Sequence, residues 1–78
     1  LYISDFENHR VVKWPKNARK GIVVAGGHYQ GRELNQLSCP RGLFVDGLGT
    51  VYVIDSGNDR VMRWQAEASR GTIVFDEN

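Results

Sequence analysis

The sequence repeats itself at a spacing of fifty residues, and this repeat restricts the fold more than any other feature. The segment LYISDFENHRVVKW at residues 1–14 returns as VYVIDSGNDRVMRW at residues 51–64. Residues 1–28 align with residues 51–78 without a gap and share nine identities in 28 positions, where unrelated segments share about two. The identical pairs are Tyr2/Tyr52, Asp5/Asp55, Asn8/Asn58, Arg10/Arg60, Val11/Val61, Trp14/Trp64, Ala18/Ala68, Gly21/Gly71 and Val24/Val74. Such a period is typical of solenoids, propellers and repeat arrays.

Each unit of the repeat is predicted to form short β-strands. Runs of β-branched and aromatic residues end at Gly, Asn, Asp or Pro, and no long stretch has apolar residues at helical spacing. Connections of about four residues between the first three strands require antiparallel neighbours. We therefore predict a four-stranded antiparallel meander, with strands at 42–46, 50–55, 60–64 and 72–75 in the complete unit.

Apolar side chains fall on both faces of the predicted strands, as in VYVID and GIVVAG. An antiparallel sheet of this kind must be covered on both sides. Radially arranged four-stranded sheets meet this requirement, because each is sandwiched between its neighbours. We predict an all-β fold, a β-propeller fragment made of four-stranded antiparallel meander blades. Residues 1–28 would be a partial blade, residues 29–39 an inter-blade connector, and residues 40–78 a complete blade.

A motif Asp-x-x-Asn-x-Arg occupies the turn between the second and third strands of each unit. Asp at a strand end accepts hydrogen bonds from N–H groups of the turn, and Asn tolerates the left-handed conformation that such turns need. Arg opens the return strand and can reach back to the carboxylate as a bidentate pair. Turn chemistry accounts for each residue, so we interpret the motif as structural rather than catalytic. Its residues are Asp5, Asn8, Arg10, Asp55, Asn58 and Arg60.

The stretch PRGLFVDGLGTVYVIDSGNDRVMRW at residues 40–64 resembles the NHL-repeat β-propeller family. The likeness lies in Pro and Gly, two strands that each end in Asp, and Asn-x-Arg-Val followed by an aromatic residue. Residues 1–14 match the latter half of the same pattern. The resemblance implies that the chain is about one and a half repeats of a longer propeller of about six blades.

The resemblance also implies a function: NHL-type blades would form a non-catalytic scaffold that presents a binding surface to a protein or nucleic-acid partner. We expect further blades of a parent chain, or second copies that complete a ring, as additional partners. The alternative is an enzyme, because similar propellers serve as metal-dependent lyases and lactonases. The active site of such an enzyme would lie mostly outside this chain.

Candidate sites for catalysis, metal or nucleotide are weak. His9, His28 and Cys39 are soft ligands, but no pair of them has the spacing of a zinc finger. The stretch VVAGGHYQGRE lacks the Lys-Ser/Thr that a phosphate-binding Walker loop requires. We therefore expect no cofactor, assign no catalytic or metal-binding residue, and read this stretch as part of a connector.

Five basic residues fall within eleven positions, and no acidic residue lies among them. Clustered Lys and Arg suit phosphate groups, and NHL propellers of tripartite-motif proteins bind RNA or protein through a basic face. The cluster is therefore a candidate patch for RNA or for a protein partner. The other interpretation is a solvated edge, where Lys discourages pairing with foreign strands. The five residues are Arg10, Lys13, Lys16, Arg19 and Lys20.

The global composition adds little about partners or compartment. The formal net charge is +1, so no long-range field steers the chain towards nucleic acid. No apolar run approaches the roughly 18 residues of a spanning helix, and we expect no membrane partner. Cys39 is the single cysteine and cannot form an internal disulfide, so the compartment stays open.

Overall fold

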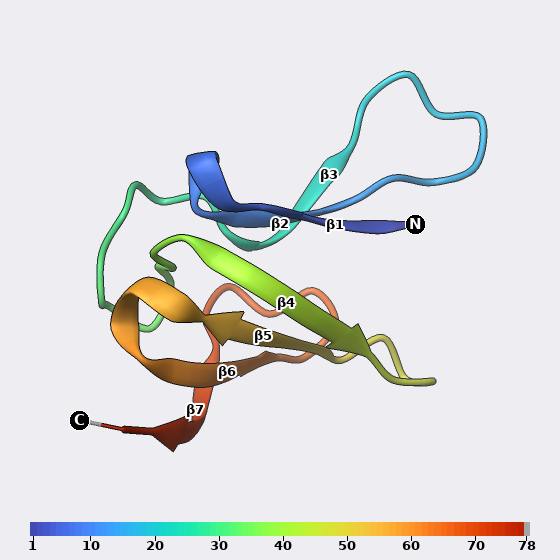
Figure 1. Cartoon of the computed structure of the whole chain (residues 1–78). Coiled ribbons are helices and arrows are strands. Elements are labelled where there is room, and N and C mark those ends of the chain that lie inside the picture. The colour runs from blue at the N-terminus through green and yellow to red at the C-terminus, as the bar shows by residue number, and fades with distance from the viewer. Residues whose placement is uncertain (78) are drawn as a thin grey trace.

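In the computed structural model, which describes residues 1–77, the chain forms two antiparallel β-sheets. This confirms the all-β class. The first sheet contains β1 (Tyr2–Asp5), β2 (Arg10–Lys13) and β3 (Ile22–Gly26). The second contains β4 (Pro40–Val45), β5 (Val51–Asp55), β6 (Arg60–Trp64) and β7 (Thr72–Asp76). In both sheets the spatial order of the strands follows the chain (Figure 1).

The strand bounds differ from the sequence prediction mainly at β4, which begins at Pro40 rather than at residue 42. Pro40 pairs with Asp55, and a bulge between Pro40 and Gly42 takes up the extra residue. The same strand ends one residue early, because the Asp46 carboxylate accepts the N–H groups of Leu48 and Thr50 in the following turn. Asp46 therefore belongs to the turn and not to the strand.

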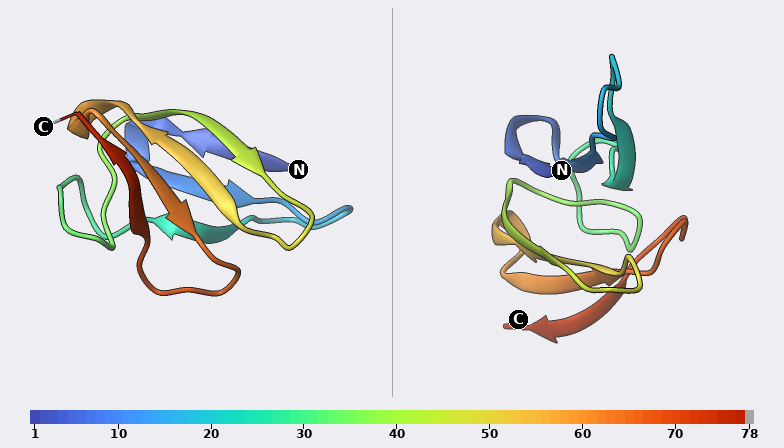
Figure 2. Two further views of the ribbon diagram at one scale, coloured as in Figure 1. Left: turned by 90° about the horizontal axis from the view of Figure 1, so that it is seen from below. Right: turned by 90° about the vertical axis from the view of Figure 1, so that its right-hand side faces the viewer.

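The two sheets lie one over the other as separate layers (Figure 2). In the first sheet, Val11 stands opposite Ser4 on one side and Ala25 on the other. Side chains at opposed positions point to the same side of a sheet, so these three residues define a surface that we call face A. In the second sheet the positions fifty residues later pair in the same way, and they define its face A: Ile54, Val61 and Phe75.

The opposite side of each sheet is face B. In the second sheet it carries two opposed pairs, Val53 with Met62 and Val51 with Trp64. The equivalent residues of the first sheet are Ile3, Val12 and Trp14, with Leu1 ahead of β1. The buried core joins face A of the first sheet to face B of the second, and Leu37 from the connector completes it. Its buried members are Val11, Ala25, Leu37, Val51, Val53, Met62 and Trp64.

One face of each sheet is thus closed and the other is at least partly open; on face B of the first sheet Val12 is buried while Ile3 is exposed. Trp64 is 2% exposed in the core, whereas Trp14, at the same position of the repeat, is 37% exposed. The sequence predicts that this shared tryptophan position packs between sheets, and only Trp64 does so within residues 1–77. The difference arises because the first sheet covers face B of the second sheet, whereas no sheet within residues 1–77 covers face B of the first.

The repeat supplies a matched pair of variants that tests this layering. We expect Val11→Ala to lower the free energy of unfolding by about 2–3 kcal/mol, from the loss of two buried carbon groups plus the cavity left behind. Val61→Ala changes the same residue at the equivalent but half-buried position, and we expect a loss of about 1 kcal/mol or less. Urea titration at low protein concentration measures both, and equal losses would contradict the layering.

Candidate functional site

The turn between β5 and β6 contains a fully buried ion pair. Arg60 Nε donates to Asp55 Oδ2 over 2.7 Å, and Asn58 Nδ2 donates to the same oxygen over 2.9 Å. The side chains of Arg60 and Asp55 are 1% and 0% exposed. The other carboxylate oxygen, Oδ1, accepts the Ser38 N–H over 2.6 Å. The motif therefore binds its own turn and the connector together.

The backbone of this turn is a single 3-10 turn, η2 (Ser56–Asn58), and β1 and β2 are joined by the equivalent η1 (Phe6–Asn8). The left-handed residue is Asp59 in one turn and His9 in the other, with φ of 53° and 55°. The sequence prediction placed this conformation at the preceding Asn and is wrong by one position. Each Asn instead uses its side-chain amide on the Asp carboxylate, and Asp and His also tolerate positive φ.

The guanidinium of Arg60 is shared between its own turn and the connector. Nη1 donates to the carbonyl of Arg32 over 2.9 Å, and Nη2 donates to the carbonyls of Glu33 and Gln36 over 3.2 and 3.1 Å. The bidentate contact with Asp55 predicted from sequence is therefore replaced by one contact through Nε. Three backbone carbonyls accept hydrogen bonds from Nη1 and Nη2, so each nitrogen of the buried guanidinium has a partner.

The connector, residues 29–39, is held in a loop at the end of the sheets where both turns lie (Figure 1). The Gln36 side chain braces it, donating to the carbonyl of His28 and accepting the N–H of Glu33. Leu37 fixes the loop to the core. The carbonyls of residues 31–36 are thus presented to Asn58 and Arg60 by a preformed loop.

The turn of the first sheet has the same ion pair in a more open setting. Arg10 Nε and Asn8 Nδ2 donate to Asp5 Oδ2 over 2.9 and 3.0 Å, but the side chains of Arg10 and Asp5 are 38% and 28% exposed. The hydrogen bond from Asn8, followed by the one from Arg10, lowers the pKa of Asp5 below its ordinary value. His9 Nδ1 accepts the N–H of Cys39, which ties this turn to the connector.

The basic cluster divides between two ends of the first sheet. Arg10 begins β2 at the turn and pairs with Asp5, whereas Lys13 ends the strand about 10 Å away. Lys16, Arg19 and Lys20 are exposed in the long loop between β2 and β3, which projects beyond the sheets (Figure 1). The structure therefore groups four of the five residues and separates Arg10 from them.

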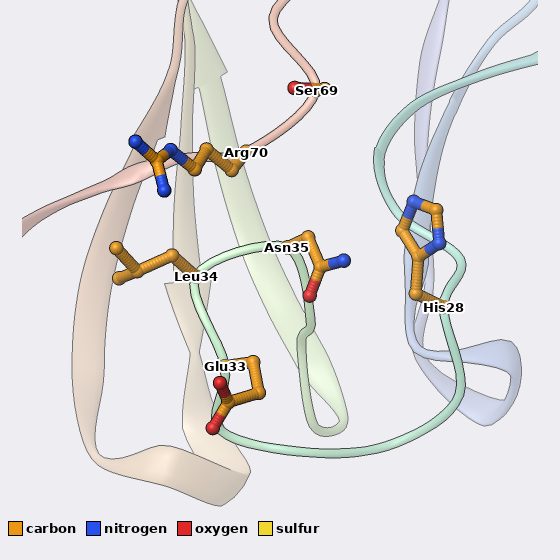
Figure 3. A pocket seen from close by; sticks show the side chains of 6 residues that line it. All are labelled: His28, Glu33, Leu34, Asn35, Ser69 and Arg70. Carbon is orange, nitrogen blue, oxygen red and sulfur yellow. The ribbon is translucent and has the colours of Figure 1, made fainter.

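An open pocket of about 350 Å³ lies where the connector meets the loop between β6 and β7. Its polar lining includes Asn35 of the connector and His28, which directly precedes the connector. Asn35 points towards His28 across the hollow (Figure 3). Arg70 and Ser69 contribute the opposite wall. The Gly71 N–H donates to the carbonyl of Leu34 over 2.8 Å and fixes the two loops to each other.

Within residues 1–77, no three metal-binding side chains converge on one point. The sequence candidates His9, His28 and Cys39 are thus not assembled into a metal site. The described helices are three-residue turns, and neither could cross a membrane.

Comparison with known proteins does not assign a family, since neither family models nor curated proteins match this chain. The resemblance to the NHL-repeat family therefore depends on the sequence pattern alone and remains a prediction.

The two ion pairs are expected to differ strongly in their contribution to stability. Arg60→Ala leaves a buried carboxylate without its partner, and we expect a loss of about 3–5 kcal/mol. Arg10→Ala removes the equivalent half-exposed pair and should cost about 1 kcal/mol or less. Chemical denaturation measures the difference. Equal losses would show that the connector does not seal the second turn.

Acid titration tests the role of Asp5. Because its pKa is lowered in the folded state, its contribution to stability is present above the unfolded-state pKa of about 3.9. That contribution is lost as the pH falls through the lowered folded-state pKa. We expect Asp5→Asn to be less stable than the wild type near neutral pH, and the gap to narrow below about pH 4. A constant gap down to pH 2 would contradict this assignment.

Proposed function

We propose that the chain is a pair of NHL-type propeller blades that acts as a non-catalytic scaffold, and that face A of the second sheet is its protein-binding surface. One observation carries the proposal. The same positions of the repeat are closed in the first sheet and open in the second. Val11 and Ala25 are 0% and 2% exposed against the second sheet, whereas Ile54 and Phe75 are 52% and 59% exposed.

The open surface extends across all four strands of the second sheet. Tyr52 stands opposite Phe44, with ring centroids 6.1 Å apart, and Ile54 and Phe75 both flank Val61. Contiguous exposed apolar surfaces of this kind mark protein interfaces. Arg63, beside Tyr52, adds a cation at the border of the patch, and Arg is enriched at protein interfaces.

The partner that fits best is another sheet that offers a face B. Face A of the first sheet already packs on face B of the second, so the contact is demonstrated within the chain. Face B of the first sheet is partly open, since Ile3 and Trp14 are exposed although Val12 between them is buried. A second copy can therefore dock head to tail, as can a further blade of the same kind, and repeated heterologous contacts of this type form a ring where the rotation between copies closes.

Sedimentation of the chain as a function of concentration tests this function. We expect reversible association that Ile54→Glu abolishes, because a carboxylate would be buried without a partner. Leu48→Glu is the control, since Leu48 is also apolar and exposed but lies in the turn after β4. A folded species that stays monomeric at millimolar concentration would count against the proposal, as would equal effects of the two substitutions.

A further inference from the structure

The two turns have the same side-chain hydrogen-bond donors, but the connector covers only the donors of the second turn. Arg60 is sealed by the carbonyls of three connector residues, and Asn58 donates to a fourth, that of Gly31. Arg10 Nε donates to Asp5 Oδ2 just as Arg60 Nε donates to Asp55 Oδ2. Among residues 1–77, however, nothing accepts a hydrogen bond from its Nη1 or Nη2.

From this contrast we propose that Arg10 and Asn8 form a docking site for a looped peptide segment, which binds through its backbone carbonyls. The segment offers backbone carbonyls to the first turn in the way that residues 31–38 offer theirs to the second turn. The site lies at the turn end of the first sheet, away from face A of the second sheet, so the proposal goes beyond the binding surface described above.

There is room for such a segment beside Arg10. An open hollow of about 670 Å³ is lined by Glu7, Asn8, His9 and Arg10 of the turn. His28 and Tyr29, where the chain enters the connector, also line this hollow. At the second turn, residues 31–36 run over Asn58 and Arg60 and bond to them. The hollow is thus the place where a segment equivalent to the connector would lie.

The second turn also defines the far end of the segment. There the Ser38 N–H donates to the second oxygen of Asp55, and the Ser38 carbonyl accepts the Gly57 N–H over 2.8 Å. The equivalent groups of the first turn are the Asp5 carboxylate and the Glu7 N–H. A Cβ at Gly57 would lie within 3 Å of Ser38, so the end of a segment at the first turn must lie further out to clear the Glu7 side chain. The ligand must therefore offer several carbonyls and then one N–H, which a folded-back peptide backbone does.

Charge favours neutral carbonyls over an anion at this site. Asp5 already neutralises Arg10 through a contact of 2.9 Å, and Glu7 adds a second carboxylate to the lining. An incoming phosphate or carboxylate would meet both acidic groups, whereas a peptide carbonyl brings no net charge. At the second turn, too, the acceptors around the ion-paired guanidinium of Arg60 are neutral backbone carbonyls.

The two sites differ in one respect that makes them separable. Arg32 of the connector forms a two-pronged contact with Asp76, at 2.9 and 3.1 Å. The residue equivalent to Asp76 in the first sheet is Gly26, which offers no carboxylate. Arg32 Nη1 also donates to the Asn58 carbonyl over 2.9 Å, and the first turn has the equivalent carbonyl of Asn8. A segment at the first turn could therefore keep this one hydrogen bond of the Arg but would lose the contact with a carboxylate.

A synthetic peptide with the sequence of residues 28–38, HYQGRELNQLS, is the probe. It is titrated into the ¹⁵N-labelled chain carrying Ile54→Glu, so that self-association through face A does not contribute. We expect saturable shifts of the Arg10 Nε–H and Asn8 amide signals, with a Kd on the order of millimolar for a few solvent-competed hydrogen bonds. The peptide with Ala in place of Arg32 loses at most the hydrogen bond equivalent to that between Arg32 Nη1 and the Asn58 carbonyl, so its affinity should fall no more than severalfold.

Arg10→Lys keeps the charge but removes the planar fork, and we expect at least tenfold weaker binding. Asn8→Ser tests the site without a change of charge and should weaken binding severalfold. Arg19→Lys is the matched control and should leave the affinity unchanged. Equal affinity of Arg10→Lys and the wild type would overturn the proposal. So would shifts confined to the second turn, or inorganic phosphate that produces the same Arg10 shifts at the same concentration.

Discussion

The buried pair of Arg60 and Asp55 is the interaction on which the rest of the structure depends. A guanidinium and a carboxylate withdrawn from water are stable only if every donor and acceptor finds a partner. The turn supplies Asn58 for one oxygen, and the connector supplies the Ser38 N–H for the other. Three connector carbonyls accept hydrogen bonds from Nη1 and Nη2 of the guanidinium. A charged pair between two strands thereby fixes a loop that starts in the other sheet, and with it the packing of the two sheets.

The two halves of the chain form a natural comparison, because nearly the same local sequence occurs in two environments. In the second sheet the turn is sealed and face A is open, whereas in the first sheet the turn is open and face A is closed. Each half thus shows what the other half lacks. A sheet fits the open face A, and a looped peptide backbone fits the open turn. Both interpretations follow from contacts that the chain already makes with itself.

Local sequence was sufficient for the strands and for the residues of the turn. β-branched runs bounded by Gly, Asn and Asp place β5 and β6 within one residue of the structure, because strand and turn preferences act over a few neighbouring residues. The details that failed were those that involve distant partners. The single rather than bidentate contact of Arg60 depends on carbonyls 24 to 28 residues away. Sequence spacing contains no information on that approach.

The sequence by itself determined a repeated antiparallel meander, the position of each turn and the Asp, Asn and Arg that hold it. These follow from alternation, turn chemistry and a period of fifty residues, all of which are local or internal to the chain. Only the tertiary structure decided which copy of each residue is buried. Trp14 and Trp64 have the same place in the repeat, yet one is 37% and the other 2% exposed. Burial depends on what packs against a side chain, and that neighbour comes from another sheet rather than from the residues beside it.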